Sequence, residues 1–304
     1  MQAKVFVPAT IGNVGPGFDV LGLAVAGLGD TLTLSLGDFQ DEVSQVKGRD
    51  ADLVPLTASE NAVIIAARHL LSAVGCQYGV KISLDRQLPV AGGLGSSAAA
   101  SVAGAVGAAA ALGKELPQEQ LLASALAGES YSAGMHLDNI APCLVGGLTG
   151  VLSPVPPVVL NLPVGCDWWV SLVTPDQKLP TREARSVLPE SLSQKDWVDM
   201  SARTLSVSHA FACGDADLLR KACQDPYAEP RRAPLVAGFM DVKQRALKKG
   251  ALACSLSGAG PTIFAICETQ KKAEQITALM AETLPGPPKL THTGPVDKKG
   301  ARIL

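Results

Sequence analysis

The chain has 304 residues, of which 47% are hydrophobic, and its formal net charge is -2. This length predicts about two domains of roughly 150 residues each. With 26 Lys and Arg against 28 Asp and Glu, the chain lacks the excess of positive charge that binds nucleic acid or an anionic membrane, so we expect a small-molecule partner.

Cysteine and histidine are too scattered to predict a metal site or a disulfide framework. The seven cysteines are an odd number without a Cys-x-x-Cys pair, and the four histidines lie far apart. The first residues show no basic segment followed by an apolar one, so we expect a cytoplasmic protein with reduced thiols. An apolar run over residues 98–112 is shorter than the roughly 20 residues of a membrane span and predicts a buried helix.

An alternating strand pattern over Lys4–Ala9 leads into a connection rich in glycine, residues 10–19. Two polar side chains, Asn13 and Asp19, stand out there among apolar neighbours. From the residues alone, hydrogen bonds that stabilise a turn are the commoner role for such side chains, and a ligand site is the alternative. We expect two further strands next, over residues 20–26 and 31–36.

A helix over Ser59–Ala73 and a strand over Val80–Leu84 precede a loop that holds three glycines in four positions, at Gly92, Gly93 and Gly95. Such a backbone can turn its amide groups toward an anion. Either serine after it, Ser96 or Ser97, can cap the helix that follows. Because the N-terminal end of a helix attracts phosphate, the loop predicts a phosphate site.

Another interpretation of the glycine loop stays open. A tight connection between a strand and a helix needs similar glycines, and for a lone cluster this is an equally good interpretation. The loop is not a Walker A motif, because no Gly-Lys-Ser or Gly-Lys-Thr follows, and it lacks Gly-x-Gly-x-x-Gly. Gly-x-Ser-x-Gly fails at both serines, which excludes a nucleophile elbow.

Pro117 predicts the start of another helix, and Glu129 falls near the end of it. A carboxylate there opposes the helix dipole, so it either meets a cation or is solvated, and solvation is the commoner case. The polar tetrad His136–Asn139 follows, which is a turn or part of a site. After strands expected over residues 148–152 and 158–160, a proline-rich interval predicts a boundary between two domains, residues 1–164 and 165–304.

The second half predicts a small α+β sandwich. Strands are expected over residues 168–173, 251–256 and 262–267, with a closing strand or two within 289–304. Helical patterns occupy residues 197–212, 215–223, 234–248 and 271–284. Between them, the segment Glu229-Pro230-Arg231-Arg232 concentrates charge.

Four motifs occur together in a fixed order: Pro-Ala-Thr…Asn-Val-Gly-Pro-Gly-Phe-Asp, Pro-x-x-x-Gly-Leu-Gly-Ser-Ser-Ala-Ala, His-x-Asp-Asn and Ser-Gly-Ala-Gly-Pro-Thr. This combination resembles the GHMP kinase superfamily. The first motif, the tetrad and Glu229-Pro230-x-Arg232 are similar to the homoserine kinases within it. The resemblance covers essentially the whole chain, although Ile11-Gly12 stands where the family more often has Ser-Ala.

The resemblance implies an α+β fold with a ribosomal-S5-like N-terminal domain and a ferredoxin-like C-terminal domain, and ATP between them. It implies ATP-dependent phosphorylation of the hydroxyl group of L-homoserine, a step of threonine biosynthesis, by a homodimer that uses Mg²⁺. By the same resemblance, Asn61 lies near the adenine, and Ser97 or Ser96 holds the metal together with Glu129. The residues implied to surround the nucleotide are Asn61, Pro89, Val90, Ala91, Gly92, Gly93, Leu94, Gly95, Ser96, Ser97, Ala98, Ala99, Gly258 and Gly260.

On the substrate side, the resemblance implies that Arg185 and Arg232 bind the carboxylate, since a guanidinium can donate two parallel hydrogen bonds to it. Around the amino and hydroxyl end it implies Asn13, Asp19, His136 and Asn139. Asp19 and Thr181 are the implied catalytic residues, although phosphoryl transfer does not require a strong base. Without the resemblance, two solvated surface charges would be the better interpretation of the arginines. Another alcohol as substrate, or a sensor without turnover, stays open.

Overall fold

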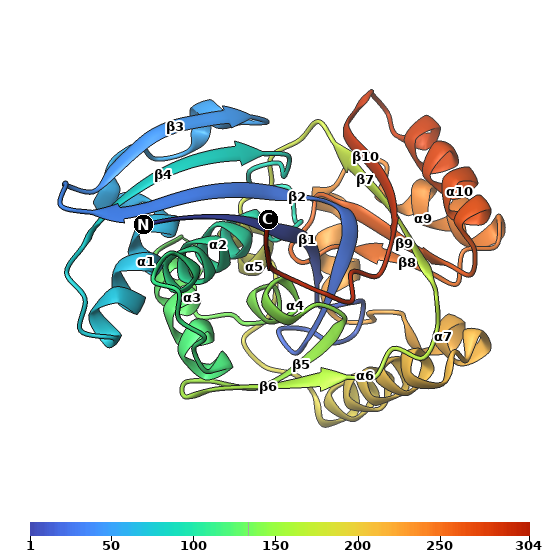
Figure 1. The fold of residues 1–304 in the computed structure, drawn as a ribbon. Helices are drawn as coiled ribbons and strands as arrows, with labels where there is room; N and C mark the ends of the chain where they lie inside the picture. Colours follow the sequence, from blue (N-terminus) through green and yellow to red (C-terminus); the bar gives the residue numbers. More distant parts are fainter. Residues whose placement is uncertain (133) are drawn as a thin grey trace.

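The computed structural model describes residues 1–132 and 134–304. Two β-sheets organise the chain, each with helices packed against it (Figure 1). The first sheet has the order β11-β1-β2-β4-β3, and β5 joins it through β2 and carries β6. Its strands are β1 (Gln2–Gly12), β2 (Leu21–Gly37), β3 (Glu42–Gly48), β4 (Gly79–Arg86), β5 (Leu148–Pro154), β6 (Pro157–Leu162) and β11 (Arg302–Ile303).

Helices cover one face of the first sheet and bury apolar side chains against it, and the small side chains over residues 96–111 allow especially close packing. They are α1 (Ala62–Ala73), α2 (Ser96–Ala111), α3 (Gln118–Ser132) and α4 (Ile140–Val145). The predicted alanine-rich helix is α2, which contacts α1, α3, β1 and β2. A side chain at Gly104 would clash with the backbone of Val63 in α1, so the glycine sets how closely the two helices approach.

The second sheet has the order β10-β7-β9-β8, and its pairs are antiparallel. Its strands are β7 (Trp169–Pro175), β8 (Ala253–Leu256), β9 (Ile263–Cys267) and β10 (Pro288–Pro295). Between β7 and β8 run α5 (Thr181–Ser186), α6 (Gln194–Cys213), α7 (Ala216–Ala222), α8 (Ala228–Arg232) and α9 (Phe239–Lys248), and α10 (Gln270–Thr283) lies between β9 and β10. This is the β-α-β-β-α-β succession of the expected ferredoxin-like unit.

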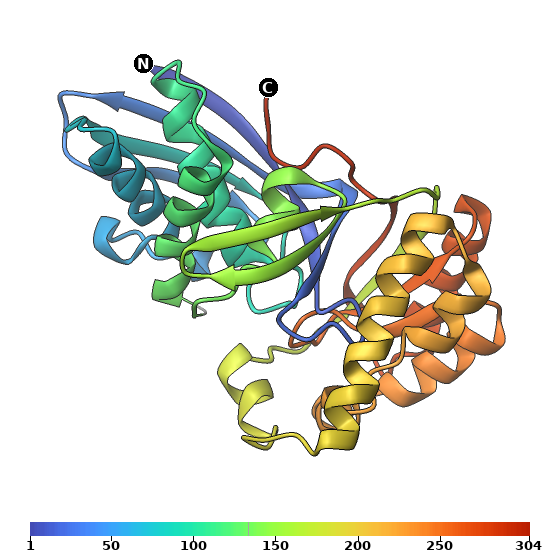
Figure 2. The ribbon, with the colours of Figure 1, turned by 90° about the horizontal axis from the view of Figure 1, so that it is seen from below.

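The two units meet at the glycine loop. Figure 2 shows the blue β1–β2 connection reaching from the first sheet to the second unit. The turn between β8 and β9 is hydrogen-bonded to the first unit, with Gly258 N–H donating to Gly12 O (3.0 Å) and Thr262 N–H to Gly92 O (3.1 Å). The chain changes sheets between β6 and β7, but β11 then pairs with β1. The second sequence segment thus returns a strand to the first sheet.

Some elements differ from the expectation because local backbone geometry overrides the pattern. The two strands expected over residues 20–26 and 31–36 are one strand, β2, whose pairing with β1 jumps from Gly29 to Val25 and so leaves a bulge. The polar edge strand β3 was not predicted, since it has no buried face to give an apolar alternation.

Helix starts also differ from the expected positions. Helix α9 begins at Phe239 rather than at Pro234, because Gly238 has a left-handed conformation (φ 77°). Helix α1 begins at Ala62 rather than at Ser59, with Asn61 as its N-cap. Gly95 (φ 65°) is the N-cap residue of α2, so neither Ser96 nor Ser97 caps this helix as expected.

Candidate functional site

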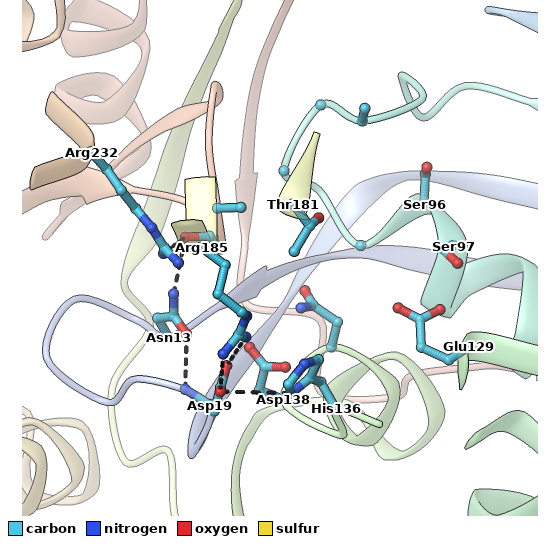
Figure 3. Close-up of a pocket in the computed structure, with 17 residues that line it drawn as sticks. Asn13, Asp19, Ser96, Ser97, Glu129, His136, Asp138, Thr181, Arg185 and Arg232 are labelled. Carbon is cyan, nitrogen blue, oxygen red and sulfur yellow. Dashed lines mark hydrogen bonds and ion pairs between the residues drawn. The ribbon is translucent and has the colours of Figure 1, made fainter. Parts of the chain in front are cut away.

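A cavity opens where the two units meet, with an empty volume of about 720 Å³ (Figure 3). It is lined by Asn13, Asp19, Ala91, Gly92, Gly93, Gly95, Ser96, Ser97, Glu129, His136, Asp138, Asn139, Thr181, Arg185, Arg232, Gly258 and Ala259. The structure thus brings the glycine loop, the polar tetrad and both arginines into one site. In Figure 3 the charged cluster around Asp19 and the pair Ser97 and Glu129 lie at opposite ends of it.

The glycine loop has the backbone that an anion site needs. Ala91, Gly93 and Gly95 have positive φ angles of 52°, 81° and 65°. At Gly93 an added Cβ would lie only 2.6 Å from Ser257 O and 2.7 Å from Gly260 O, so a side chain is excluded there. The loop leads directly into α2, whose first N–H groups have no partner within the helix and attract negative charge.

Several residues expected around the nucleotide are not exposed to this cavity. The side chains of Leu94, Ala98 and Ala99 are buried in the hydrophobic cores. Pro89 packs under Gly92, and Gly260 packs against Gly93. Apart from Pro89, which has no N–H group, such residues can bind a phosphate only through the main chain, which is the way glycine loops bind it.

A second cavity adjoins the first at Ser96 and Ser97, which line both. Its walls include Val54, Pro55, Asn61, Val63, Leu84, Val90 and Tyr131. Asn61 is 2% exposed, accepts a hydrogen bond from Val63 N–H (3.1 Å) and donates to Pro55 O (2.8 Å). Its side chain therefore shapes the wall of a mainly apolar pocket beside the glycine loop.

Glu129 is buried, being 7% exposed, although solvation was the commoner expectation for a carboxylate at a helix end. Burial raises its pKa to about 7, opposed by a hydrogen bond with Ser97 and reinforced by the charge of Asp138. A hydroxyl and a carboxylate side by side are the oxygen donors that Mg²⁺ prefers, and Mg²⁺ in kinase sites takes further ligands from phosphate and water. The donor set therefore fits this ion.

Asp19 is the centre of the charged cluster. Arg185 donates two hydrogen bonds to its carboxylate, Nη1 to Oδ2 at 3.0 Å and Nη2 to Oδ1 at 2.9 Å, and His136 Nδ1 lies 3.6 Å from Oδ2. Asn13 accepts from Asp19 N–H (3.0 Å) and donates to Gly258 O (3.0 Å). Both Asn13 and Asp19 have left-handed φ angles, 68° and 56°. The turn interpretation is confirmed, and the same strained turn presents both side chains to the cavity, which is compatible with the site interpretation.

Arg232 is only 3% exposed, so it is not the solvated surface charge that the residues alone favoured. Its Nε donates to Ala184 O (3.0 Å) and its Nη1 to Gly258 O (3.1 Å). Asp225 caps the short helix α8 that carries it, accepting from Tyr227 N–H and Ala228 N–H (2.8 Å each). The guanidinium is thereby held at the cavity wall from both sides.

Asp138 lines the cavity, and sequence reasoning did not single it out within the tetrad. It is 4% exposed, and burial, followed by the charge of Asp19, raises its pKa to about 7. Its neighbour Asn139 accepts a hydrogen bond from the Thr10 hydroxyl (2.9 Å). The signal was present in the sequence, because three of the four residues of the tetrad are polar and stand beside an apolar segment.

Two segments of the sequence match known domain families. A model of the GHMP kinases N-terminal domain matches residues 61–147, and a model of the GHMP kinases C-terminal domain matches residues 207–286. The chain belongs to the GHMP kinase family. Membership confirms the expected superfamily, its two-domain α+β fold and the kinase class, and it implies ATP as the co-substrate.

Within the GHMP kinase family, a homoserine kinase of Xylella fastidiosa (strain 9a5c) is 36% identical over 308 residues, covering 100% of this chain and 94% of the relative. A homoserine kinase of Xanthomonas campestris pv. campestris (strain B100) is 35% identical with the same coverage. The crystal structure of homoserine kinase from Cytophaga hutchinsonii superposes with a TM-score of 0.94 at 35% identity, covering 100% of this chain and 97% of that chain.

Two negative findings concern the part of the chain that the structure describes. No helix there is long and apolar enough to cross a membrane. No group of three or more His, Cys, Asp or Glu side chains there could hold a metal ion.

Proposed function

We propose that the chain is a homoserine kinase, which transfers the γ-phosphoryl group of ATP to the hydroxyl of L-homoserine and yields O-phospho-L-homoserine and ADP. One observation carries the proposal: a single cavity joins a glycine loop suited to phosphate with two arginines and two carboxylates suited to an amino acid. The full-length similarity to homoserine kinases supports this substrate, and threonine biosynthesis is then the pathway.

The nucleotide is proposed to lie across the two adjoining cavities. Its phosphates would meet the N–H groups of the glycine loop and of the first turn of α2. Its adenine would enter the mainly apolar second pocket beside Asn61, which shares Ser96 and Ser97 with the first. Within this arrangement, Ser97 and Glu129 would hold Mg²⁺, which neutralises the charge on the β- and γ-phosphate oxygens.

The substrate is proposed to bind between Asp19 and Arg185 and to replace their mutual ion pair. L-homoserine carries both an ammonium and a carboxylate, so its two charges can each replace one partner of that pair. The carboxylate would meet Arg185 and Arg232, and the ammonium would meet Asp19 and Asn13. This leaves the hydroxyl to face Asp138, Asn139, His136 and Thr181, which line the rest of the cavity.

In the proposed reaction the hydroxyl oxygen attacks the γ-phosphorus, the new O–P bond forms, and the bond to the oxygen between the β- and γ-phosphorus breaks to release ADP. Positioning and charge neutralisation carry most of such catalysis. The hydroxyl proton passes to a carboxylate or to the transferred phosphoryl group. Asp138 suits this role better than Asp19, because its pKa is near 7 while Asp19 is proposed to bind the substrate ammonium.

The decisive experiment measures ADP release from Mg-ATP with and without L-homoserine, together with a panel of other amino alcohols and hydroxy acids. Release that depends on L-homoserine is expected. If ADP is released only with another alcohol, that alcohol is the substrate of the kinase. If the protein binds the nucleotide but releases no ADP, it is a sensor rather than an enzyme. A homodimer is a further proposal that rests on the family, and size measurement in solution tests it. A cytoplasmic location and a domain boundary near residue 164 are proposals that rest on the sequence patterns described above.

A further inference from the structure

One aromatic ring contacts both arginines of the candidate site. The guanidinium carbon of Arg185 lies over the ring of Phe18 at 5.2 Å from its centroid, and that of Arg232 lies at the same distance. A guanidinium is attracted to the electron-rich face of an aromatic ring at distances up to about 6 Å. Phe18 can therefore stabilise both cations at once.

The two cations repel each other, and Arg232 is buried although the side chain of Arg185 is 38% exposed. Arg185 is paired with the Asp19 carboxylate, but within the described residues no carboxylate forms an ion pair with Arg232. Its hydrogen bonds go to the backbone carbonyls of Ala184 and Gly258. Burial, followed by the charge of Arg185, lowers the pKa of Arg232. The charges of Asp225, Asp19 and Asp138 offset part of this effect, and the ring adds further attraction.

The loop that carries Phe18 is fixed on both sides of the ring. Gly17 N–H donates to Asn13 O (2.9 Å), and the Thr204 hydroxyl of α6 donates to Pro16 O (3.1 Å). Asp19, the next residue, supplies the counterion of Arg185. On its other side, Phe18 lines an apolar groove with residues of β5, β6 and α6, so its ring separates that groove from the charged cavity. One short loop thus presents a ring and a carboxylate to the arginines.

We propose that Phe18 is a positioning residue whose ring holds the guanidinium groups of Arg185 and Arg232 at a fixed separation, so that both bind one substrate carboxylate. The inference rests on the proposed function. Phe18 acts through the arginines and does not touch the substrate. Its loss should therefore weaken recognition of the carboxylate and leave nucleotide binding and the phosphoryl transfer step largely intact.

The experiment compares Phe18→Leu, which keeps an apolar side chain but removes the ring, with Phe18→Tyr, which keeps the ring. For each variant the KM for L-homoserine, the KM for ATP and kcat are measured. The inhibition constant of 3-aminopropan-1-ol, which has the amine and hydroxyl of homoserine but no carboxylate, is measured in parallel. Phe6→Leu is the matched control, because Phe6 has a similar contact with Arg302 (4.3 Å) at the β1–β11 edge. Phe18→Met replaces Phe18→Leu if the latter does not fold.

Loss of two cation–π contacts should raise the KM for L-homoserine by about 5- to 30-fold in Phe18→Leu. The KM for ATP and the inhibition constant of 3-aminopropan-1-ol should stay within about twofold, and Phe18→Tyr and Phe6→Leu should resemble the parent. An unchanged KM in Phe18→Leu, an equal weakening of the analogue, or failure of Phe18→Tyr to retain affinity would overturn the inference. Absence of turnover with L-homoserine in the parent protein would instead contradict the proposed function.

Discussion

Lys289 of β10 and Asp50 form an ion pair that ties the second sheet to the start of the glycine loop. The Lys289 ammonium lies 2.7 Å from each carboxylate oxygen, and Asp50 Oδ2 also accepts from Val90 N–H (2.9 Å). The two side chains are only 18% and 14% exposed. Burial disfavours the charge, but the hydrogen bonds from Lys289 and Val90 prevail and lower the pKa of Asp50.

Lys289→Met should therefore loosen the loop as well as the junction between the units. We expect a loss of about 1–3 kcal/mol in the free energy of unfolding, since a partly buried charged hydrogen bond is removed. The KM for ATP should rise several-fold with little change in the KM for the phosphoryl acceptor. Lys298→Met is the control, because Lys298 pairs with Asp167 at the surface. Equal effects of both substitutions on the KM for ATP would contradict the role of Asp50 at the loop.

Gly93→Ala tests whether the loop depends on close backbone approach. The left-handed conformation alone costs an alanine roughly 1–2 kcal/mol. Gly113 (φ 65°) is a suitable control, because nothing lies within 4 Å of an added Cβ there, whereas Gly93 meets two carbonyl oxygens. We expect Gly93→Ala to lose about 1–3 kcal/mol more than Gly113→Ala in urea unfolding, and to weaken ATP binding. If both variants lose the same free energy of unfolding, the contact of the added Cβ at position 93 with the two carbonyl oxygens has no energetic effect.

Arg232→Ala should mainly raise the KM for L-homoserine. A charge-assisted hydrogen bond is worth roughly 1.5–3 kcal/mol, which corresponds to about 10- to 150-fold. Arg231→Ala is the matched control, because this neighbouring arginine is exposed and donates to Tyr227 O. Steady-state kinetics with each substrate varied in turn measure the effect. A KM for L-homoserine that stays at the parental value would remove Arg232 from the site.

Asp138→Asn should change how stability depends on pH. The folded-state pKa of Asp138 is raised to about 7 from an ordinary 3.8, so the folded protein binds more protons than the unfolded chain between these values. Stability therefore falls as the pH rises from about 4 to about 7, and the asparagine variant lacks this contribution. The variant should be more stable than the parent by roughly 1–4 kcal/mol at pH 8, and the difference should shrink toward pH 4. A difference independent of pH would contradict a raised pKa.

Substitution of Asp19 and substitution of Asp138 should change different kinetic constants. Asp19→Asn should weaken binding of the amino acid but leave kcat within a few-fold, because Asp19 is proposed to bind the ammonium. Asp138→Asn should lower kcat by about 10²-fold or more if the carboxylate accepts the proton. The dependence of kcat on pH near 7 should then disappear with it. An unchanged kcat in Asp138→Asn would leave the phosphoryl group itself as the proton acceptor.

Patterns within single segments predicted much of the fold and the site. Alternation and helical periodicity indicated most elements, and the glycine loop, Asn13, Asp19, Arg185 and Arg232 were expected in a site that the structure assembles. What the patterns could not give depends on contacts between distant residues. Asp138 has a raised pKa because it is buried, with Gly12 of β1 and Gly22 of β2 packed against it, and because the charge of Asp19 acts on it.

The same limit explains the other differences. The cap of α2 at Gly95 depends on a left-handed backbone that packs against Thr10 and Asn139, and no local propensity encodes that packing. Likewise, Asp50 and Lys289 are separated by 239 residues, so no local sequence pattern could predict that this ion pair supports the glycine loop.

The return of β11 to β1 limits how the site can open. The polypeptide crosses between the two units twice, once after β6 and once after β10, and Asp297 anchors the second crossing to Ala24 and Gly147. Residues of both units also share one hydrophobic core, in which Ile11 and Leu94 of the first unit pack with Phe264 of the second. Outright separation of the two halves would therefore have to break the pairing of β11 with β1 and expose that shared core to water.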